Sequence, residues 1–198
     1  MSIATAKECK TPDLIRTVAG KLFSQSGYKG LGMRSLAAEV GIQPGSLYNH
    51  IESKQALLYE LISEYEMQLL QIFKAKNVAR SRKAIQMNSS LWAAVSKFVE
   101  ENYHLAQVSR TQIQHLDPDQ ADSIIGIRLR RKRQLLVLLT QCSEDLGLSE
   151  EGLEQLSGEV TALLDCYINL GADPAVDPGG TLKRHLHNLA SMLLVKRD

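Results

Sequence analysis

Two short helical patterns separated by one glycine constrain this chain more than any other feature of it. The first pattern covers about residues 33–40 and the second about residues 44–51, with Gly41 between them. Glycine adopts the left-handed conformations that a tight turn between helices needs. Pro44 opens the second pattern, at a position where a helix has no use for the missing N–H. The spacing therefore predicts two short helices joined by an abrupt turn.

Further helical patterns flank this pair. Thr11-Pro12-Asp13 is a helix start, and apolar residues at helical spacing run from there to Gly27, which is expected to end the helix in a left-handed C′ conformation. A long helix capped by Ser53 follows the pair at once. Leu47 and Ile51 are four residues apart and are expected to face the core. The sequence therefore predicts a three-helix head followed by a bridging helix.

The remainder of the chain predicts more helices and no strand. Helical patterns span about residues 88–115, 117–142, 150–170 and 181–195. With 198 residues and 44% hydrophobic composition, the chain can bury a core. We expect an all-α fold in which residues 1–54 form a helix-turn-helix domain and residues 55–198 form a second, helical domain. The helix from Ser53 bridges the two.

Several protein classes are excluded or disfavoured. The chain contains no Gly-rich phosphate loop and no nucleophile or paired-histidine motif, so we expect neither an enzyme nor a cofactor. His104, His115 and the aspartates near residue 119 fit no compact metal motif, and Asp117 suits a helix N-cap better. No apolar run is long enough for a membrane span, the start lacks a secretory pattern, and the three cysteines are scattered. We therefore expect a cytoplasmic protein.

The charge is unevenly distributed. Residues 1–54 hold seven lysines and arginines against four acidic residues, whereas the remainder holds 16 against 18. A basic head on a slightly acidic body suits nucleic-acid contact confined to the head. The basic run at residues 128–133 lies within a predicted helix of the body, where a solvated face is the simplest interpretation, with a salt-bridged face as the alternative.

The head resembles a known family in several ordered elements. These are Leu22-Phe23, Gly27-Tyr28, MRSLAAEVGI at 33–42, GSLYNHI at 45–51 and SKQALL at 53–58. Over about residues 11–62 the chain resembles the DNA-binding head of the TetR (tetracycline-repressor-like) family of bacterial transcriptional regulators. The resemblance implies that the second short helix enters the major groove of DNA. Beyond residue 62 it is architectural only.

Eight residues of the head are the candidate DNA contacts. Gly45 permits close approach to a base edge, Ser46 and Asn49 are short polar groups suited to the groove, and Arg34 can reach a guanine or a phosphate. Tyr48, His50 and Lys54 match positions that touch backbone phosphates in the family. The complete set is Arg34, Pro44, Gly45, Ser46, Tyr48, Asn49, His50 and Lys54.

One departure from the family pattern lies just before the first of the two short helices. The family often has Thr and Ser where this chain has Leu31 and Gly32. A hydroxyl there caps the helix and usually bonds a phosphate. Gly32 is expected to serve as a modest N-cap without that phosphate contact, which predicts slightly weaker anchoring of the DNA backbone.

The resemblance also implies a body that encloses a small-molecule site and dimerises. Candidate ligand contacts are Met87, Leu91, Trp92, Val95, Phe98 and Tyr103, although such apolar stripes also form ordinary cores. The helices at about 150–170 and 181–195 are the expected homodimer interface. A dimeric repressor that binds palindromic double-stranded DNA and is released by a small hydrophobic effector is the expected function. The segment 110–128 resembles family members that respond to fatty or acyl-thioester ligands.

Two alternatives stay open at this point. The chain could be a constitutive DNA-binding regulator or activator without an effector. It could also be a helical interaction module or an enzyme built on a helix-turn-helix scaffold.

Overall fold

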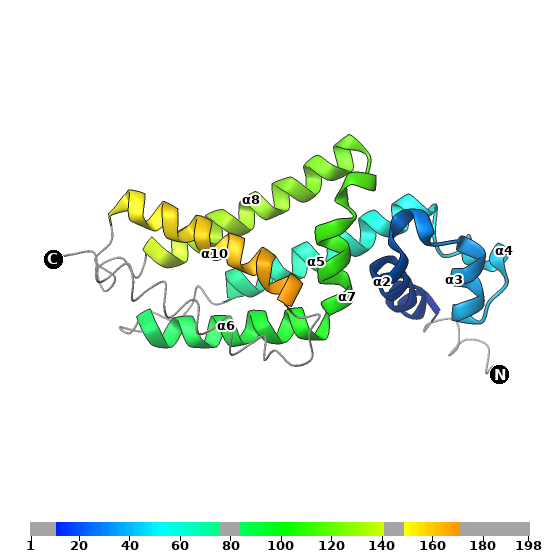
Figure 1. Cartoon of the computed structure of the whole chain (residues 1–198), viewed down its shortest axis with the longest axis horizontal. Helices are drawn as coiled ribbons and strands as arrows, with labels where there is room; N and C mark the ends of the chain where they lie inside the picture. Colours follow the sequence, from blue (N-terminus) through cyan, green and yellow to red (C-terminus); the bar gives the residue numbers. More distant parts are fainter. Residues whose placement is uncertain (1–10, 76–83, 141–148, 171–198) are drawn as a thin grey trace. The chain divides into compact units, whose positions relative to one another are not determined.

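The computed structural model of the chain describes residues 11–75, 84–140 and 149–170. Every regular element in these ranges is helical, so the predicted all-α fold is confirmed (Figure 1). The chain divides into two compact units. The first contains Met1–Tyr65 and His104–Ile124, and the second contains Glu66–Tyr103 and Ile125–Asp198. The predicted domain boundary at residue 54 stays a prediction.

The first unit begins with the head. It contains α2 (Thr11–Gly30), α3 (Met33–Val40), α4 (Pro44–Leu47) and the start of α5 (Lys54–Ala75), and α3 contacts both α2 and α4. Side chains from all four helices form its core: Ile15, Ala19, Phe23, Leu36, Ala37, Leu47, Leu57, Leu58 and Leu61. Burial of each large apolar side chain stabilises the fold by roughly 1.5–3 kcal/mol. The head is thus a small core with short helices arranged over it.

Gly27 interrupts α2 and does not end it. Its φ of 68° is positive, as predicted, but its ψ of 176° lies far from the left-handed helical value. The predicted left-handed C′ conformation is therefore wrong. The N–H of Leu31 donates to the carbonyl of Gly27 at 3.2 Å, so one more turn follows the kink.

Residues 104–124 complete the first unit. They comprise most of α7 (Tyr103–Thr111), the 3₁₀ turn η2 (Ile113–His115) and the start of α8 (Pro118–Thr140). The sequence predicted one continuous helix from about residue 88 to residue 115, which is wrong. That helix breaks at Asn102, whose side-chain amide donates to the carbonyl of Phe98 at 2.9 Å. Such a local side-chain bond competes with the helical backbone pattern.

The second unit contains the rest of α5, α6 (Ala84–Glu101), the rest of α8 and α10 (Glu150–Leu170). Ser149 caps α10, because its hydroxyl accepts the N–H of Gly152 at 3.2 Å. The apolar core includes Leu69, Leu70, Phe73, Val95, Val99, Ile127, Leu135, Leu138, Leu153, Leu156 and Val160. The helix predicted at 181–195 lies outside the described residues.

The basic run of α8 is only partly a solvated face. Glu66 of α5 is buried, and its two carboxylate oxygens accept from Arg128 at 2.8 Å and from Arg131 at 2.7 Å. The side chain of Arg131 is only 6% exposed, whereas Arg130, Lys132 and Arg133 are exposed. The solvated interpretation is therefore wrong for Arg131, because the run winds around the helix and one side of it faces α5.

Candidate nucleic-acid interface

The second helix of the pair presents its polar side chains outward. Leu47 is 0% exposed and Ile51 is 8% exposed, as predicted, and these two residues fix α4 on the core. Tyr48 is 55% exposed, and Asn49 and His50 are exposed beside it. Pro44 and Gly45 are exposed too, and Ser46 is half-buried. The predicted contacts in this segment are thus exposed, apart from Ser46, which is half-buried.

The regular part of this helix is shorter than predicted. The α-helical part spans only Pro44–Leu47, and residues 48–50 form a turn in which Asn49 donates to the carbonyl of Ser46 and His50 to that of Leu47. These are bonds to the third preceding residue, which tighten the backbone. The predicted regular helix to residue 51 is therefore wrong, although the N–H of Ile51 still reaches the carbonyl of Leu47 at 3.2 Å.

Gly41 sets the angle between α3 and α4. Its φ of 78° and ψ of 30° place it in the left-handed region, and its N–H donates to the carbonyl of Ala38 at 3.1 Å. The next N–H, of Ile42, reaches the carbonyl of Ala37 at 2.9 Å. Left-handed glycine at a helix C-terminus satisfies carbonyls that the helix leaves open. The predicted glycine turn is confirmed.

The start of α3 carries the departure from the family pattern. Leu31 is buried, so it belongs to the core of the head. Gly32 is the N-cap of α3 and supplies no side-chain cap bond. Arg34 is exposed in the first turn of α3. A basic side chain is therefore accessible here, while the hydroxyl that usually meets a phosphate is missing.

Lys54 is held in a more specific environment than the sequence suggested. Ser53 caps α5, because its hydroxyl accepts the N–H of Ala56 at 2.9 Å. The ammonium of Lys54, in the first turn, lies 4.5 Å from the centroid of the Tyr28 ring. Partial burial lowers the pKa of the Lys54 ammonium. The predicted phosphate ligand is thus a half-buried cation resting on an aromatic ring.

Sequence reasoning missed the residues that surround Tyr28. The Tyr28 ring stacks on Phe23 at 6.1 Å and on His115 at 5.0 Å between centroids. The side-chain oxygen of Gln112 accepts the N–H of Tyr28 at 2.8 Å. Tyr28 and Gln112 are 84 positions apart, so no local pattern could have paired them.

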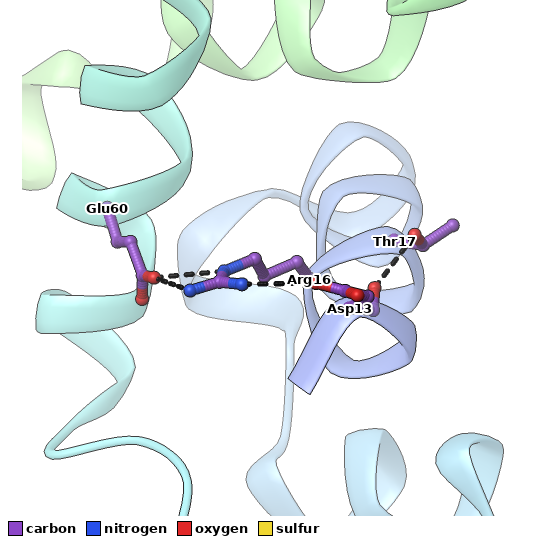
Figure 2. Close-up of polar contacts among 4 residues, drawn as sticks. All are labelled: Asp13, Arg16, Thr17 and Glu60. Carbon is purple, nitrogen blue, oxygen red and sulfur yellow. Dashed lines mark hydrogen bonds and ion pairs between the residues drawn. The ribbon is translucent and has the colours of Figure 1, made fainter. Parts of the chain in front are cut away.

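An ion pair joins α2 to α5 within the head (Figure 2). The guanidinium of Arg16 donates to one carboxylate oxygen of Glu60, through Nε at 2.9 Å and through a second nitrogen. A further guanidinium nitrogen of Arg16 reaches Asp13 at 3.3 Å. The bond to Glu60 is the main cause that raises the pKa of Arg16. The pair links α2 to α5 at a point six residues after Lys54.

The predicted ligand contacts are separate from one cavity in the described part of the second unit. Leu91 and Val95 are buried, and Phe98 and Tyr103 are half-buried. The side chains of Met87 and Trp92 lie outside the described part. A cavity of about 370 Å³ between α8 and α10 is lined by Lys132, Leu136, Glu151, Glu154, Gln155 and Ser157. That cavity includes none of the predicted ligand residues.

Two further features of the described ranges bear on other functions. No group of three or more His, Cys, Asp or Glu side chains there could hold a metal ion. None of the described helices combines the length and the apolarity that crossing a membrane requires.

Comparison with known proteins agrees with the geometry of the head. Residues 15–61 match the family model of bacterial regulatory proteins, tetR family. The HTH-type transcriptional regulator UidR of Escherichia coli (strain K12) is 32% identical over 60 residues, which are 30% of this chain and 31% of UidR. The matched region therefore spans about a third of that relative.

Solved structures extend the likeness to both units. The TetR family regulator PfmR of Thermus thermophilus has a TM-score of 0.79 at 21% identity, covering 89% of this chain and 97% of PfmR. The fatty acid degradation regulator FadR of Bacillus halodurans has a TM-score of 0.68 at 17% identity, covering 92% and 94%. Likeness at such identities establishes the fold.

An outward recognition helix on a small apolar core, continued by a helical body, defines the class of helix-turn-helix regulators. Residues 15–61 match the bacterial regulatory proteins of the tetR family, and the chain as a whole has the fold of solved TetR family regulators.

Proposed function

We propose that the chain is a homodimeric DNA-binding transcriptional repressor that responds to a small ligand. The observation that carries the proposal is the surface of α4, where Gly45, Tyr48 and Asn49 are exposed while Leu47 is fully buried. A helix that is anchored by one residue and exposes short polar groups suits the major groove. Arg34 and Lys54 supply the positive charge that neighbouring phosphates require.

Regulation would follow from a dimer. Two copies joined through α10 and residues 181–195 would present two recognition helices to the two halves of a palindromic operator. A ligand that binds one arrangement of the two heads better than the other would shift the population and change operator affinity. The same assignment makes the chain a cytoplasmic protein without a cofactor.

Apolar and aromatic side chains of the body support a hydrophobic effector. Leu91 and Val95 are apolar and buried, and Phe98 and Tyr103 add aromatic surface on α6 and α7. The similarity in fold to a fatty acid degradation regulator agrees with a hydrophobic effector. A ligand that binds the native state raises the unfolding temperature. A series of fatty acids and their acyl thioesters, screened by thermal shift, therefore tests this part of the proposal.

The decisive experiment for DNA binding is selection of bound duplexes from a random pool, followed by titration of the enriched sequence. Replacement of Lys54 by Ala should weaken binding to all sequences and reduce the slope of log affinity against log salt by about 1. Replacement of Tyr48 by Ala should weaken binding as well, because a phosphate donor is lost.

The matched control is Lys74→Ala, an exposed lysine in the last turn of the same helix. It should leave both affinity and salt slope unchanged. If the folded protein enriches no sequence, or if the Lys54 and Lys74 variants behave alike, the proposed DNA interface is wrong.

A further inference from the structure

We propose that His115, a residue far outside the predicted DNA-binding motif, is a positioning residue for operator binding. In this assignment His115 fixes the Tyr28 ring, and the Tyr28 ring holds the ammonium of Lys54 where it meets a DNA phosphate. The inference rests on the proposed DNA-binding function. It adds a contact that connects the segment between α7 and α8 with the proposed DNA-binding surface of the protein.

The ring contacts form one continuous cluster. The rings of Tyr28 and His115 have centroids 5.0 Å apart and planes inclined by 21°, so they are stacked. Tyr28 also stacks on the buried Phe23, with planes inclined by 7°. The Lys54 ammonium lies 4.5 Å from the centroid of the Tyr28 ring, within the range of a cation–π attraction. Any rotation of the Tyr28 ring therefore displaces the surface on which Lys54 rests.

Polar contacts fix both sides of this cluster. The N–H of Tyr28 donates to Gln112, which lies three residues before His115. The side-chain amide of Gln55 donates to the carbonyl of His115 at 3.2 Å and to the carboxylate of Asp117 at 2.9 Å. Gln55 is the direct neighbour of Lys54 on α5. The backbone of His115 and the base of the Lys54 side chain are thus held together across one junction.

Further contacts join segment 104–115 to α2. Gly20 and Ser24 are four residues apart on one face of α2, and Tyr28 follows directly after the kink at Gly27. The structure places Leu105 against Gly20, and a hydrogen bond of 2.9 Å joins Ser24 to His104. Segment 104–115 is therefore attached along the length of α2, and its last residue, His115, meets the ring that carries Lys54. The stacking of His115 on Tyr28 is therefore one of several contacts that hold this segment on α2.

The functional consequence concerns the freedom of the lysine. A lysine side chain loses rotamer entropy when it is fixed. Where the Tyr28 ring already restricts the ammonium, less of that entropy is lost when a phosphate arrives. Without the His115 ring beside it, Tyr28 can turn, and Lys54 binds the phosphate from a more mobile starting state.

The test uses the full-length protein and its selected operator. His115→Ala should weaken operator binding about two- to fivefold, the range that an exposed cation–π contact supports, and should lower the salt slope towards that of Lys54→Ala. His115→Phe keeps a flat ring and should restore both values. Gln114→Ala truncates the exposed neighbour of His115 in the same turn, so it should match the wild type.

The double variant separates positioning from simple stability. If His115 acts through Lys54, then His115→Ala has no further effect on affinity in a Lys54→Ala background. Additive effects would overturn the proposal, and so would an unchanged salt slope in His115→Ala. Should the alanine variant fail to fold, the comparison of His115→Leu with His115→Phe decides, because only the second keeps a stacking ring. A wild-type protein that binds no DNA would instead refute the proposed function itself.

Discussion

At the scale of single residues, Gly45 is a position where the fold tolerates a side chain but the proposed DNA contact does not. A Cβ built on this residue meets no other atom within 4 Å, so the protein itself leaves room for a side chain. The residue stands on the exposed surface of α4, between Pro44 and Ser46. The fold therefore does not require glycine here, and the proposed contact with DNA is what its small size would serve.

Replacement of Gly45 by Ala should therefore change stability and DNA binding in opposite directions. Alanine favours a helix over glycine by up to about 1 kcal/mol, so the free energy of unfolding should stay equal or rise. The added methyl group should weaken operator binding, because it holds α4 away from the base edges. Urea unfolding and operator titration of the same preparation measure both effects. Loss of stability without loss of affinity would contradict the assignment.

Gly41 shows the reverse case, in which the backbone itself requires glycine. At a φ of 78° a residue with a Cβ is strained even where there is space for its side chain. Gly41→Ala should lower the free energy of unfolding by about 1–2 kcal/mol, and Gly41→Asn by less, since asparagine tolerates this region. Gly126→Ala is the control, because Gly126 lies within α8 with open space around its Cα and negative φ. That variant should be stabilised by roughly 0.5–1 kcal/mol.

At the scale of elements, the contact between α5 and α8 depends on one buried carboxylate. The side chain of Glu66 is 3% exposed and meets Arg128 and Arg131 on the facing helix. Burying these charges is unfavourable unless each keeps its partner, so removing one partner costs far more than the pair contributes. Removal of the carboxylate would therefore take a charged partner from the buried guanidinium of Arg131.

Glu66→Ala should lower the free energy of unfolding by about 3–5 kcal/mol, measured by denaturant titration. The matched control is Glu101→Ala, which removes an exposed carboxylate paired with Lys97 at 3.7 Å. An exposed pair contributes roughly 0–1 kcal/mol, so that variant should differ little from the wild type. Equal effects of the two substitutions would show that burial of Glu66 has no energetic role.

The elements also show why prediction succeeded in some places and failed in others. The head was predicted well because its signals are local: the turn at Gly41, the cap at Ser53 and the spacing of Leu47 and Ile51 lie within a few residues. The break at Asn102 was missed, since asparagine also occurs within helices. The partners of Tyr28 and Glu66 lie far away along the chain, and no periodicity pairs residues over such distances.

The sequence therefore predicted the exposed residues of the candidate site but not the residues beneath them. Sequence reasoning identified the residues that face outward, such as Tyr48 and Asn49, because exposure follows from which neighbours are apolar. Their roles in DNA binding stay predictions. The support beneath Lys54, formed by Tyr28 and His115, required the tertiary structure.

At the scale of the whole molecule, the proposed dimer makes stability depend on protein concentration. If two copies unfold together, association stabilises the folded state by mass action. The unfolding temperature should rise with each tenfold increase in concentration, and light scattering should give twice the mass of the 22.0 kDa chain. An unfolding temperature independent of concentration, with a monomer mass, would contradict a dimer and with it the two-headed contact to a palindrome.

The length of helix α5 determines how far a tilt at one of its ends moves the other end. It runs without interruption from Lys54 to Ala75, and its sequence contains neither proline nor glycine, the residues at which helices usually bend. At 1.5 Å per residue its 22 residues span about 33 Å. A tilt of about 5° at one end therefore moves the other end by about 3 Å, close to the rise of one base pair. If Lys54 binds a DNA phosphate as proposed, a displacement of this size would be large enough to separate the two.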